Sequence, residues 1–380
     1  MAYTKVYWRP SQVPTGALIV MALISLSGLL MVETMRRQDT TADYGMMAAA
    51  ARQMQDGMAH ISQLRGKIRQ VDADVDPQES GIIGVSSSPV TSLAGHLPAK
   101  QTTINPNWAA VALKMLSEAG VGKGDVVAVA VSGSFPALNL AAYTAIEELG
   151  ARPIIIVSGS ASQWGANVPG LIWIDMAREL RAAGFIRSRE VAASLGGAED
   201  RGIGISDRGR DIIRLAIKRA ELQFLFPATL DEAVAKRIAL YSKYANGRPI
   251  KAYINIGGGT ASTGPPAIDQ YFEPGLITSA GPKAFAVESV TGHFLKQGVP
   301  VINFSGIATI AARYGLPLAP QVAPPMGAGG VYNTMGYRRW LAGIWIVVII
   351  FLIYVVTRIS GVVSAFESKH DDPRQIRPTI

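Results

Sequence analysis

The sequence of 380 residues contains no cysteine and only four histidines. The absence of cysteine excludes disulfide bonds and thiolate metal sites, but it does not fix the cellular compartment, because many extracytoplasmic proteins lack disulfides. Charged residues make up only 17% of the chain, whereas hydrophobic residues make up 49%. The mean hydropathy of +0.23 is high for a soluble protein, and the apolar excess is concentrated near the two ends of the chain.

A large excess of either charge is also lacking in the middle of the chain. The net charge is +8, yet residues 33–337 carry 28 lysines and arginines against 25 aspartates and glutamates. Most of the positive excess therefore lies in the two end regions. Bulk charge indicates no general polyanion-binding face, so no nucleic-acid partner is predicted.

Several motifs of common enzymes are missing. There is no GxxxxGKS/T phosphate loop, no GxGxxG follows an expected strand, and the nucleophile elbow GxSxG is absent. The stretch IGGGT resembles the phosphate loop of actin-like ATPases, but Asn255 and Ile256 stand where that family places a metal-organising aspartate. This argues against ATP hydrolysis and leaves nucleotide binding as a weaker alternative. No histidine or carboxylate cluster has metal-site spacing, so neither a cofactor nor a metal is predicted.

Two long runs without a charge lie near the chain ends, at residues 15–32 and 340–356. A helix that crosses ~30 Å of hydrocarbon needs about 20 apolar residues, so each run is just long enough. Trp8 precedes the first run, and Arg339 and Arg358 border the second, as is typical of membrane interfaces. Either run could instead be a buried core helix. The first could also be a cleaved signal peptide, but it is unusually long and no small-x-small cleavage site follows it.

We therefore expect two membrane spans, which place both termini on one side of the bilayer. The tails carry six basic residues and the inner flanks carry five, so the positive-inside rule gives only a weak preference for cytoplasmic termini and an extracytoplasmic domain. The predicted organisation is a tail (1–14), a transmembrane helix (15–32), a helical stalk (33–76), an α/β domain (77–316), a Pro/Gly-rich linker (317–339), a transmembrane helix (340–356) and a tail (357–380).

Between the spans, short apolar segments alternate with helical ones. Residues 125–131 read DVVAVAV, which is typical of a strand buried on both faces. Such alternation implies parallel strands with right-handed crossovers, so we predict an α/β fold with a doubly wound, mostly parallel sheet. Further strands or short apolar runs are expected at 82–85, 153–157, 171–174, 251–256 and 299–304. Helices are expected at 106–119, up to 149, and at 175–183, 211–223, 230–244 and 284–296.

Two further segments have a distinctive composition. Residues 39–71 are alanine-rich with apolar residues near helical spacing, which predicts an amphipathic helix. This helix could pack on the domain or lie on the membrane surface. Residues 195–210 are rich in glycine and arginine and predict a loop.

Four expected strands end in small hydroxylated or glycine residues, at 132–134, 158–160, 257–260 and 305–306. In an open α/β sheet the ligand crevice lies beyond the carboxyl ends of the strands. Loops without bulky side chains let backbone N–H groups approach an anion or a carboxylate, although turn geometry alone could also explain each loop. We predict a ligand site here. The binding candidates are Ser132, Gly133, Ser134, Asn139, Ser158, Ser160, Gly257, Gly258, Gly259 and Thr260.

A serine hydrolase is the enzyme alternative that the remaining residues allow. Its nucleophile would be Ser134 or Ser132, directly after the expected central strand. The base would be His293 or His96, and Asp175 could complete a triad. A single histidine on a helix is more often structural, so these are weak catalytic candidates.

Several stretches together resemble one family. They are residues 80–109, 122–151, 162–176, 191–197 and 254–264, with SGSFPALN and WGAN as the most specific parts. The chain resembles the poly-γ-glutamate system protein family, bacterial membrane-associated proteins encoded beside the poly-γ-glutamate ligase and its small membrane partner. The resemblance covers most of residues 75–310. It implies a location in the bacterial cytoplasmic membrane, ligase complex subunits as partners, and a role in capsule or secreted-polymer synthesis or export, but it assigns no catalytic residue.

Two hypotheses follow. In the first, the protein is an accessory component whose domain binds the anionic γ-linked glutamate polymer or a partner subunit. In the second, it is a hydrolase or transferase that acts on the polymer through a serine nucleophile. The first does not need a catalytic constellation, and the sequence offers no convincing one.

Overall fold

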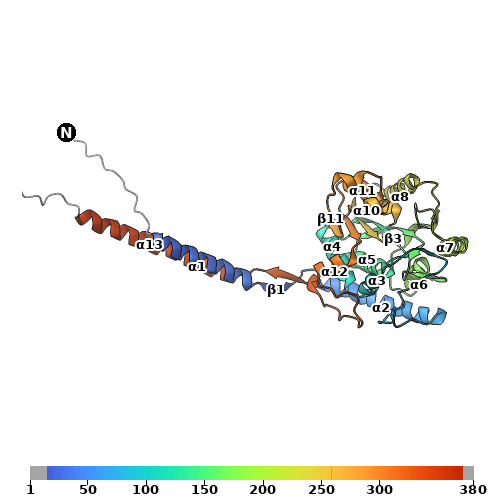
Figure 1. The fold of residues 1–380 in the computed structure, drawn as a ribbon, viewed down its shortest axis with the longest axis horizontal. Coiled ribbons are helices and arrows are strands. Elements are labelled where there is room, and N and C mark those ends of the chain that lie inside the picture. The colour runs from blue at the N-terminus through green and yellow to red at the C-terminus, as the bar shows by residue number, and fades with distance from the viewer. Residues whose placement is uncertain (1–14, 258, 371–380) are drawn as a thin grey trace, which may run out of the picture. The chain divides into compact units, whose positions relative to one another are not determined.

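A computed structural model describes residues 15–257 and 259–370, and the side chains of residue 38 and of residues 359–370 lie outside this description. The chain divides into two compact units, one formed by Thr40–Tyr332 and one by the described parts of the two ends. The first unit contains a seven-stranded, mostly parallel sheet with helices. The second contains two long apolar helices (Figure 1).

The larger unit alternates strands and helices along the chain. The strands of its main sheet are β3 (Val126–Ser132), β4 (Arg152–Ser158), β8 (Glu190–Ser194), β9 (Gln223–Leu225), β10 (Ile250–Ile256), β11 (Gly275–Ile277) and β12 (Val301–Phe304). Two short pairs are β2 (Thr91–Leu93) with β5 (Ala161–Ser162), and β6 (Asn167–Val168) with β7 (Leu171–Ile172). The helices are α2 (Tyr44–Ile68), α3 (Leu97–Thr103), α4 (Trp108–Glu118), α5 (Pro136–Leu149), α6 (Trp173–Ala182), α7 (Asp207–Arg219), α8 (Leu230–Ala245), α9 (Thr260–Thr263), α10 (Pro266–Asp269), α11 (Val290–Lys296) and α12 (Ile307–Arg313), with 3-10 turns η1 (Pro282–Phe285) and η2 (Gly330–Tyr332).

The strand order of the main sheet is β11-β12-β10-β3-β4-β8-β9. Neighbours from β12 to β9 pair in parallel, and the edge strand β11 is antiparallel to β12. From β3 the chain proceeds outward through β4, β8 and β9. It then returns to the other side of β3 as β10 and continues to β12. The strand order therefore reverses between β3 and β10.

The central strand β3 is buried on both faces, as its composition predicted. Val127 and Val129 belong to one hydrophobic cluster, whereas Val126 and Ala128 belong to another, because successive side chains of a strand point to opposite faces. Helices α2, α4, α5, α6, α7 and α12 contribute to the first cluster, and α8 to α11 contribute to the second (Figure 1). A right-handed crossover changes face when the chain changes direction, so the two helix layers follow from the reversal of strand order.

Helix α2 belongs to the first of these layers. It buries Met47, Met54 and Ile61 and packs against α4, α5 and α6. Gly57 permits the close approach, because a Cβ atom there would lie 3.1 Å from the Leu140 side chain. The sequence predicted a helical stalk at residues 33–76 that either packs on a domain beginning at 77 or lies on the membrane surface. In the structure the compact unit begins at Thr40 and includes this helix.

The proline- and glycine-rich segment before the second apolar helix is also tied to the larger unit. The fully buried Asn107 accepts hydrogen bonds from the Gly327 N–H (3.1 Å) and the Tyr332 hydroxyl (2.7 Å). Its amide nitrogen donates to the carbonyl of Pro325 (3.0 Å). The Asn107 side chain therefore bonds three residues of the segment that the sequence analysis assigned to a linker.

Some element predictions differ from the structure. The short strands β8, β9 and β11 were not predicted, because they lack a long β-branched run. The predicted helix 284–296 is wrong as a single helix: the 3-10 turn η1 comes first, and α11 then begins after Ser289, whose hydroxyl accepts the Gly292 N–H (3.0 Å). The apolar run 82–85 forms neither helix nor strand. The predicted loop 195–210 ends early, because Ser206 caps α7 through the Gly209 N–H.

The smaller unit consists of α1 (Thr15–Thr34), β1 (Arg37–Thr40), β13 (Asn333–Gly336) and α13 (Arg339–His370), and β1 pairs with β13. The two helices pack side by side (Figure 1). Gly28 allows their contact, since a Cβ atom there would lie 2.6 Å from the Trp345 ring. Thr15–Thr34 and Arg339–Arg358 have mean hydropathies of 2.3 and 2.6, and only 6% of each apolar window is buried inside the structure. Both are long and apolar enough to cross a membrane.

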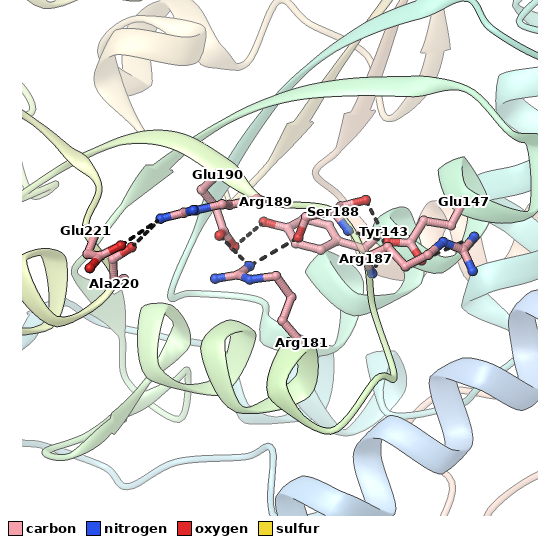
Figure 2. A network of polar contacts seen from close by, with 9 residues as sticks. All are labelled: Tyr143, Glu147, Arg181, Arg187, Ser188, Arg189, Glu190, Ala220 and Glu221. Atoms are coloured by element: carbon pink, nitrogen blue, oxygen red, sulfur yellow. Dashed lines mark hydrogen bonds and ion pairs between the residues drawn. The ribbon is translucent and has the colours of Figure 1, made fainter.

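A polar network secures the amino-terminal edge of β8 (Figure 2). Glu190, the first residue of β8, is buried and accepts hydrogen bonds from Arg181 Nη1 (2.6 Å) and the Tyr143 hydroxyl (3.0 Å). Burial and the negative charge of Glu190 raise the pKa of Tyr143 well above its ordinary value, so this hydroxyl stays protonated and donates. Beside it, Glu147 accepts the N–H of Ser188 (2.7 Å). The network fixes the turn between α6 and β8, far from the strand carboxyl ends.

Candidate functional site

The carboxyl ends of β3 and β4 are joined side by side. Ser132 and Ser158, the last residues of the two strands, are register partners. Beyond them, the N–H of Gly133 donates to the carbonyl of Ser160 (3.0 Å). Two of the loops predicted to bind a ligand therefore form one continuous surface.

The carboxyl end of β10 meets the same surface from the other side of β3. Gly257 has a φ of +90°, a conformation that favours glycine. A Cβ atom at this position would overlap the Ser132 hydroxyl and lie 3.3 Å from Ser134 Cβ. The backbone of the third predicted loop thus touches the first loop directly, at the point where the strand order reverses.

The end of β8 extends this surface through a loop that was not predicted to take part. The Gly197 N–H donates to the Ser160 hydroxyl (2.9 Å). Asp200 accepts a hydrogen bond from Ser194 Oγ (2.5 Å) and pairs with the fully buried Arg237 of α8 (2.8 Å). Burial is the largest single influence and lowers the pKa of Arg237, but the charge and hydrogen bond of Asp200, together with Tyr241 and Tyr253, raise that pKa overall, so the guanidinium is charged.

Lys100 of α3 lies beneath the β3 loop. Its side chain is buried, and its Nζ donates to the carbonyl of Ser134 (2.5 Å) and to Ser162 Oγ (2.9 Å). The ammonium also stands 3.5 Å from the centroid of the Phe135 ring, in cation–π geometry. Burial lowers the pKa of Lys100 to about 7. Nothing in the sequence distinguished this lysine, because it reaches the site only through the packing of α3 against α5.

The outer surface of the joined loops is partly open. Gly257, Gly259 and Thr260 are half-buried, whereas the serines below them are buried. A Cβ atom at Gly259 would have Ser158 Oγ, 3.8 Å away, as its nearest neighbour, so the loop has room for a side chain at that position. Gly257, Gly259 and Thr260 thus form the accessible face of the site among the described residues.

The other binding candidates have separate positions. Asn139 is fully buried and donates to the carbonyl of Ser132 (2.8 Å), so it positions the β3 loop. Gly258 lies outside the described residues. The fourth loop, Ser305 and Gly306, lies one strand further along at the end of β12, where Gly306 packs against Pro274. The structure therefore joins three of the four predicted loops.

The candidate catalytic triad is not assembled. His293 of α11 lines a cavity of about 580 Å³ beside Arg248 and Ile250, which lie at the amino end of β10. Ser134 lies at the opposite edge, and the length of a seven-residue strand such as β10 separates the two edges by roughly 20 Å. Asp175 pairs instead with Arg219 of α7 (2.7 Å). His96 is exposed just before α3 and makes no hydrogen bond to Ser132 or Ser134 within the described residues.

The arrangement offers hydroxyl groups and backbone amides at one edge of the sheet, next to the buried Lys100 and the buried Arg237–Asp200 ion pair. Such groups recognise carboxylates or other anions. Lys100, Ser162, Asp200 and Arg237 were missed by sequence reasoning, because only the fold brings them to this edge. Comparison of the chain with protein-family models, with curated proteins and with solved structures gives no match.

Proposed function

We propose that this protein is a membrane-anchored accessory component of poly-γ-glutamate synthesis or export, and that its joined β3, β4 and β10 loops bind carboxylates of the polymer. The observation that carries the proposal is the convergence of three hydroxyl- and glycine-rich loops where the strand order reverses. Ligands of open α/β sheets bind at such positions. The sheet would then be a doubly wound sheet whose ligand crevice lies between β3 and β10.

The two apolar helices support the membrane part of the proposal. Each reaches the length that a bilayer crossing requires, and Gly28 provides the small-residue contact with Trp345 that is common between membrane helices. We place both termini in the cytoplasm and the α/β unit outside the bacterial cytoplasmic membrane. There it would meet the polymer as it leaves the ligase complex, whose subunits are its proposed partners.

The assignment of the polymer rests on the family resemblance of residues 80–109, 122–151 and 162–176. The loops support it chemically, because a γ-linked glutamate chain presents one carboxylate per residue. Charge-assisted hydrogen bonds from hydroxyl and backbone donors suit such a ligand. The described loops 132–134 and 158–160 contain no acidic residue, and the nearby Asp200 carboxylate is paired with the buried Arg237.

Gly259→Asp tests the binding site with little risk to the fold. Gly259 has an ordinary φ of −66° and space for a side chain, so both Gly259→Asp and its uncharged counterpart Gly259→Asn should fold. An added carboxylate close to a bound carboxylate costs about 1–4 kcal/mol, depending on the local dielectric. We expect Gly259→Asp to weaken binding of γ-linked glutamate oligomers about tenfold or more, and Gly259→Asn to bind nearly as the unmodified chain.

The assay is calorimetric titration of the full-length protein in detergent micelles. Equal binding by both variants would reject the loop as the site, and no binding by the unmodified protein would reject the polymer as its ligand. In cells, deletion of the gene should change the amount or chain length of secreted polymer. Unchanged polymer would contradict the role in synthesis or export.

A further inference from the structure

Lys100 is buried against polar groups and an aromatic ring, without a carboxylate partner among the described residues. Its Nζ contacts the Ser134 carbonyl, Ser162 Oγ and the Phe135 ring, and among the described residues no carboxylate forms an ion pair with it. Burying an ammonium without a counter-charge is costly, whereas methionine would fill a similar space. A buried lysine of this kind is a frequent general base, because desolvation favours its neutral form.

Ser162 is the hydroxyl that this lysine reaches. The residue ends the short strand β5, and its N–H donates to Ser134 Oγ (3.1 Å), which fixes the backbone of one serine against the side chain of the other. Lys100 contacts the carbonyl of Ser134 but the hydroxyl of Ser162. The geometry therefore pairs the lysine with Ser162 and not with Ser134, the residue that the sequence favoured as a nucleophile.

The loop after Ser162 is under backbone strain. Trp164 has a φ of +57°, which is rare for a bulky residue and is tolerated only where the surroundings enforce it. Here Gly84 and Val85 enforce it, since the Trp164 N–H donates to the carbonyl of Val85 (2.9 Å) and the Gly84 N–H donates to the carbonyl of Trp164 (3.2 Å). Strain of this kind is concentrated at functional sites.

We propose that Ser162 is an acyl-transfer nucleophile and that Lys100 is its general base, acting on a secondary amide. Neutral Lys100 takes the Ser162 hydroxyl proton while Oγ attacks the amide carbonyl carbon. The carbon–nitrogen bond then breaks, and the resulting Lys100 ammonium returns the proton to the departing amine. Water, activated by the neutral lysine, hydrolyses the acyl-serine ester and restores both residues. With an amine in place of water the same steps transfer the acyl group.

A substrate can reach Ser162 only if the residues that bury it move. Ser162 is 3% exposed, and the partly exposed Gln163 and Trp164 lie directly after it in the chain. The choice of a γ-linked amide as substrate rests on the proposed function, whereas the assignment of nucleophile and base does not.

A fluorophosphonate, which phosphonylates activated serines, tests this assignment without a known substrate. The full-length protein in detergent micelles is incubated with the probe, and modified residues are located by mass spectrometry of peptides. We expect modification of Ser162, its loss in Ser162→Ala, and a rate at least a hundredfold lower in Lys100→Met. Ser242→Ala is the matched control: Ser242 is exposed on α8 and lines the cavity beside Arg248 at the amino end of β10, so its replacement should leave labelling unchanged.

Three results would overturn the proposal: no labelled serine in folded protein, labelling at Ser134 instead, or labelling that persists unchanged in Lys100→Met. The melting temperature of each variant shows whether it is folded, and a Lys100→Met variant that fails to fold is replaced by Lys100→Gln. Oligomer binding by the same preparation is measured in parallel. Binding without labelling would support the proposed function and reject Ser162 as the nucleophile. Labelling without binding would support Ser162 as the nucleophile and reject the proposed function.

Discussion

Replacing Lys100 by methionine tests whether the ammonium beneath the β3 loop is buried without a counter-charge. Burial lowers the pKa of Lys100 from 10.5 to about 7. Between these two values the unfolded state binds more protons than the folded state, so the stability of the unmodified protein rises with pH across this window. Each pKa unit corresponds to about 1.4 kcal/mol. The whole shift therefore lowers the free energy of unfolding by about 5 kcal/mol at pH 7 and below.

Methionine removes this cost together with the hydrogen bonds to Ser134 and Ser162, which contribute about 1 kcal/mol each. We therefore expect Lys100→Met to be about 3 kcal/mol more stable than the unmodified protein at pH 7. Above pH 10.5 only the loss of the hydrogen bonds remains, and the variant should be about 2 kcal/mol less stable. The difference in stability should change sign between these limits.

The measurement is urea unfolding of the full chain in detergent micelles, followed by tryptophan fluorescence at several pH values from 6 upward. The difference between variant and unmodified protein isolates Lys100, because both share every other titrating group. A stability difference that stays constant with pH would refute the reasoning, since it would show that the lysine titrates alike in the folded and unfolded chains.

Three further substitutions test other parts of the structure. Asn107→Ala removes the anchor of the segment before α13 and should lower the free energy of unfolding by about 2–4 kcal/mol, with increased proteolysis between residues 317 and 330; an unchanged cleavage pattern would contradict the anchoring role. Asp200→Ala leaves the buried Arg237 unpaired and should cost about 3–5 kcal/mol, measured by urea unfolding against Asp231→Ala on α8 as an exposed control. Gly28→Leu places a side chain where Trp345 packs and should weaken the α1–α13 contact, seen as a loss of cross-linking between cysteines introduced into the two helices.

The long strands could be predicted because the residues of each strand are themselves typical of a buried strand. β3 reads VVAVAVS and is buried on both faces, so local composition alone identifies it. β8 reads EVAAS and becomes a strand only because β4 and β9 flank it, which is information that no local pattern contains. The antiparallel β11 is likewise defined by its pairing with β12. The alanine-rich α2 was predicted as a helix, but its place in the core depends on α4 and α5.

The candidate site was predictable only at the level of loops. Glycine and serine at strand ends indicated where a ligand could approach, and parallel pairing brings three of these loops together. The side chains that give the site its charge come from distant positions: Lys100 from the short helix α3 and Arg237 from α8. Their sequence neighbours suggest ordinary surface residues. The His293 hypothesis failed to yield a triad because α11 leads into the amino end of β12 and so places this residue at the opposite edge.

Hydrogen–deuterium exchange of the full-length protein with and without a γ-linked glutamate oligomer tests the binding site most directly. At saturating oligomer we expect slower exchange in peptides covering residues 132–139, 158–165 and 257–263, and no change in those covering 248–250 and 290–299 at the other edge of the sheet. Protection confined to the cavity beside His293, or unaltered exchange at all three loops, would contradict a carboxylate site at the carboxyl ends of β3, β4 and β10.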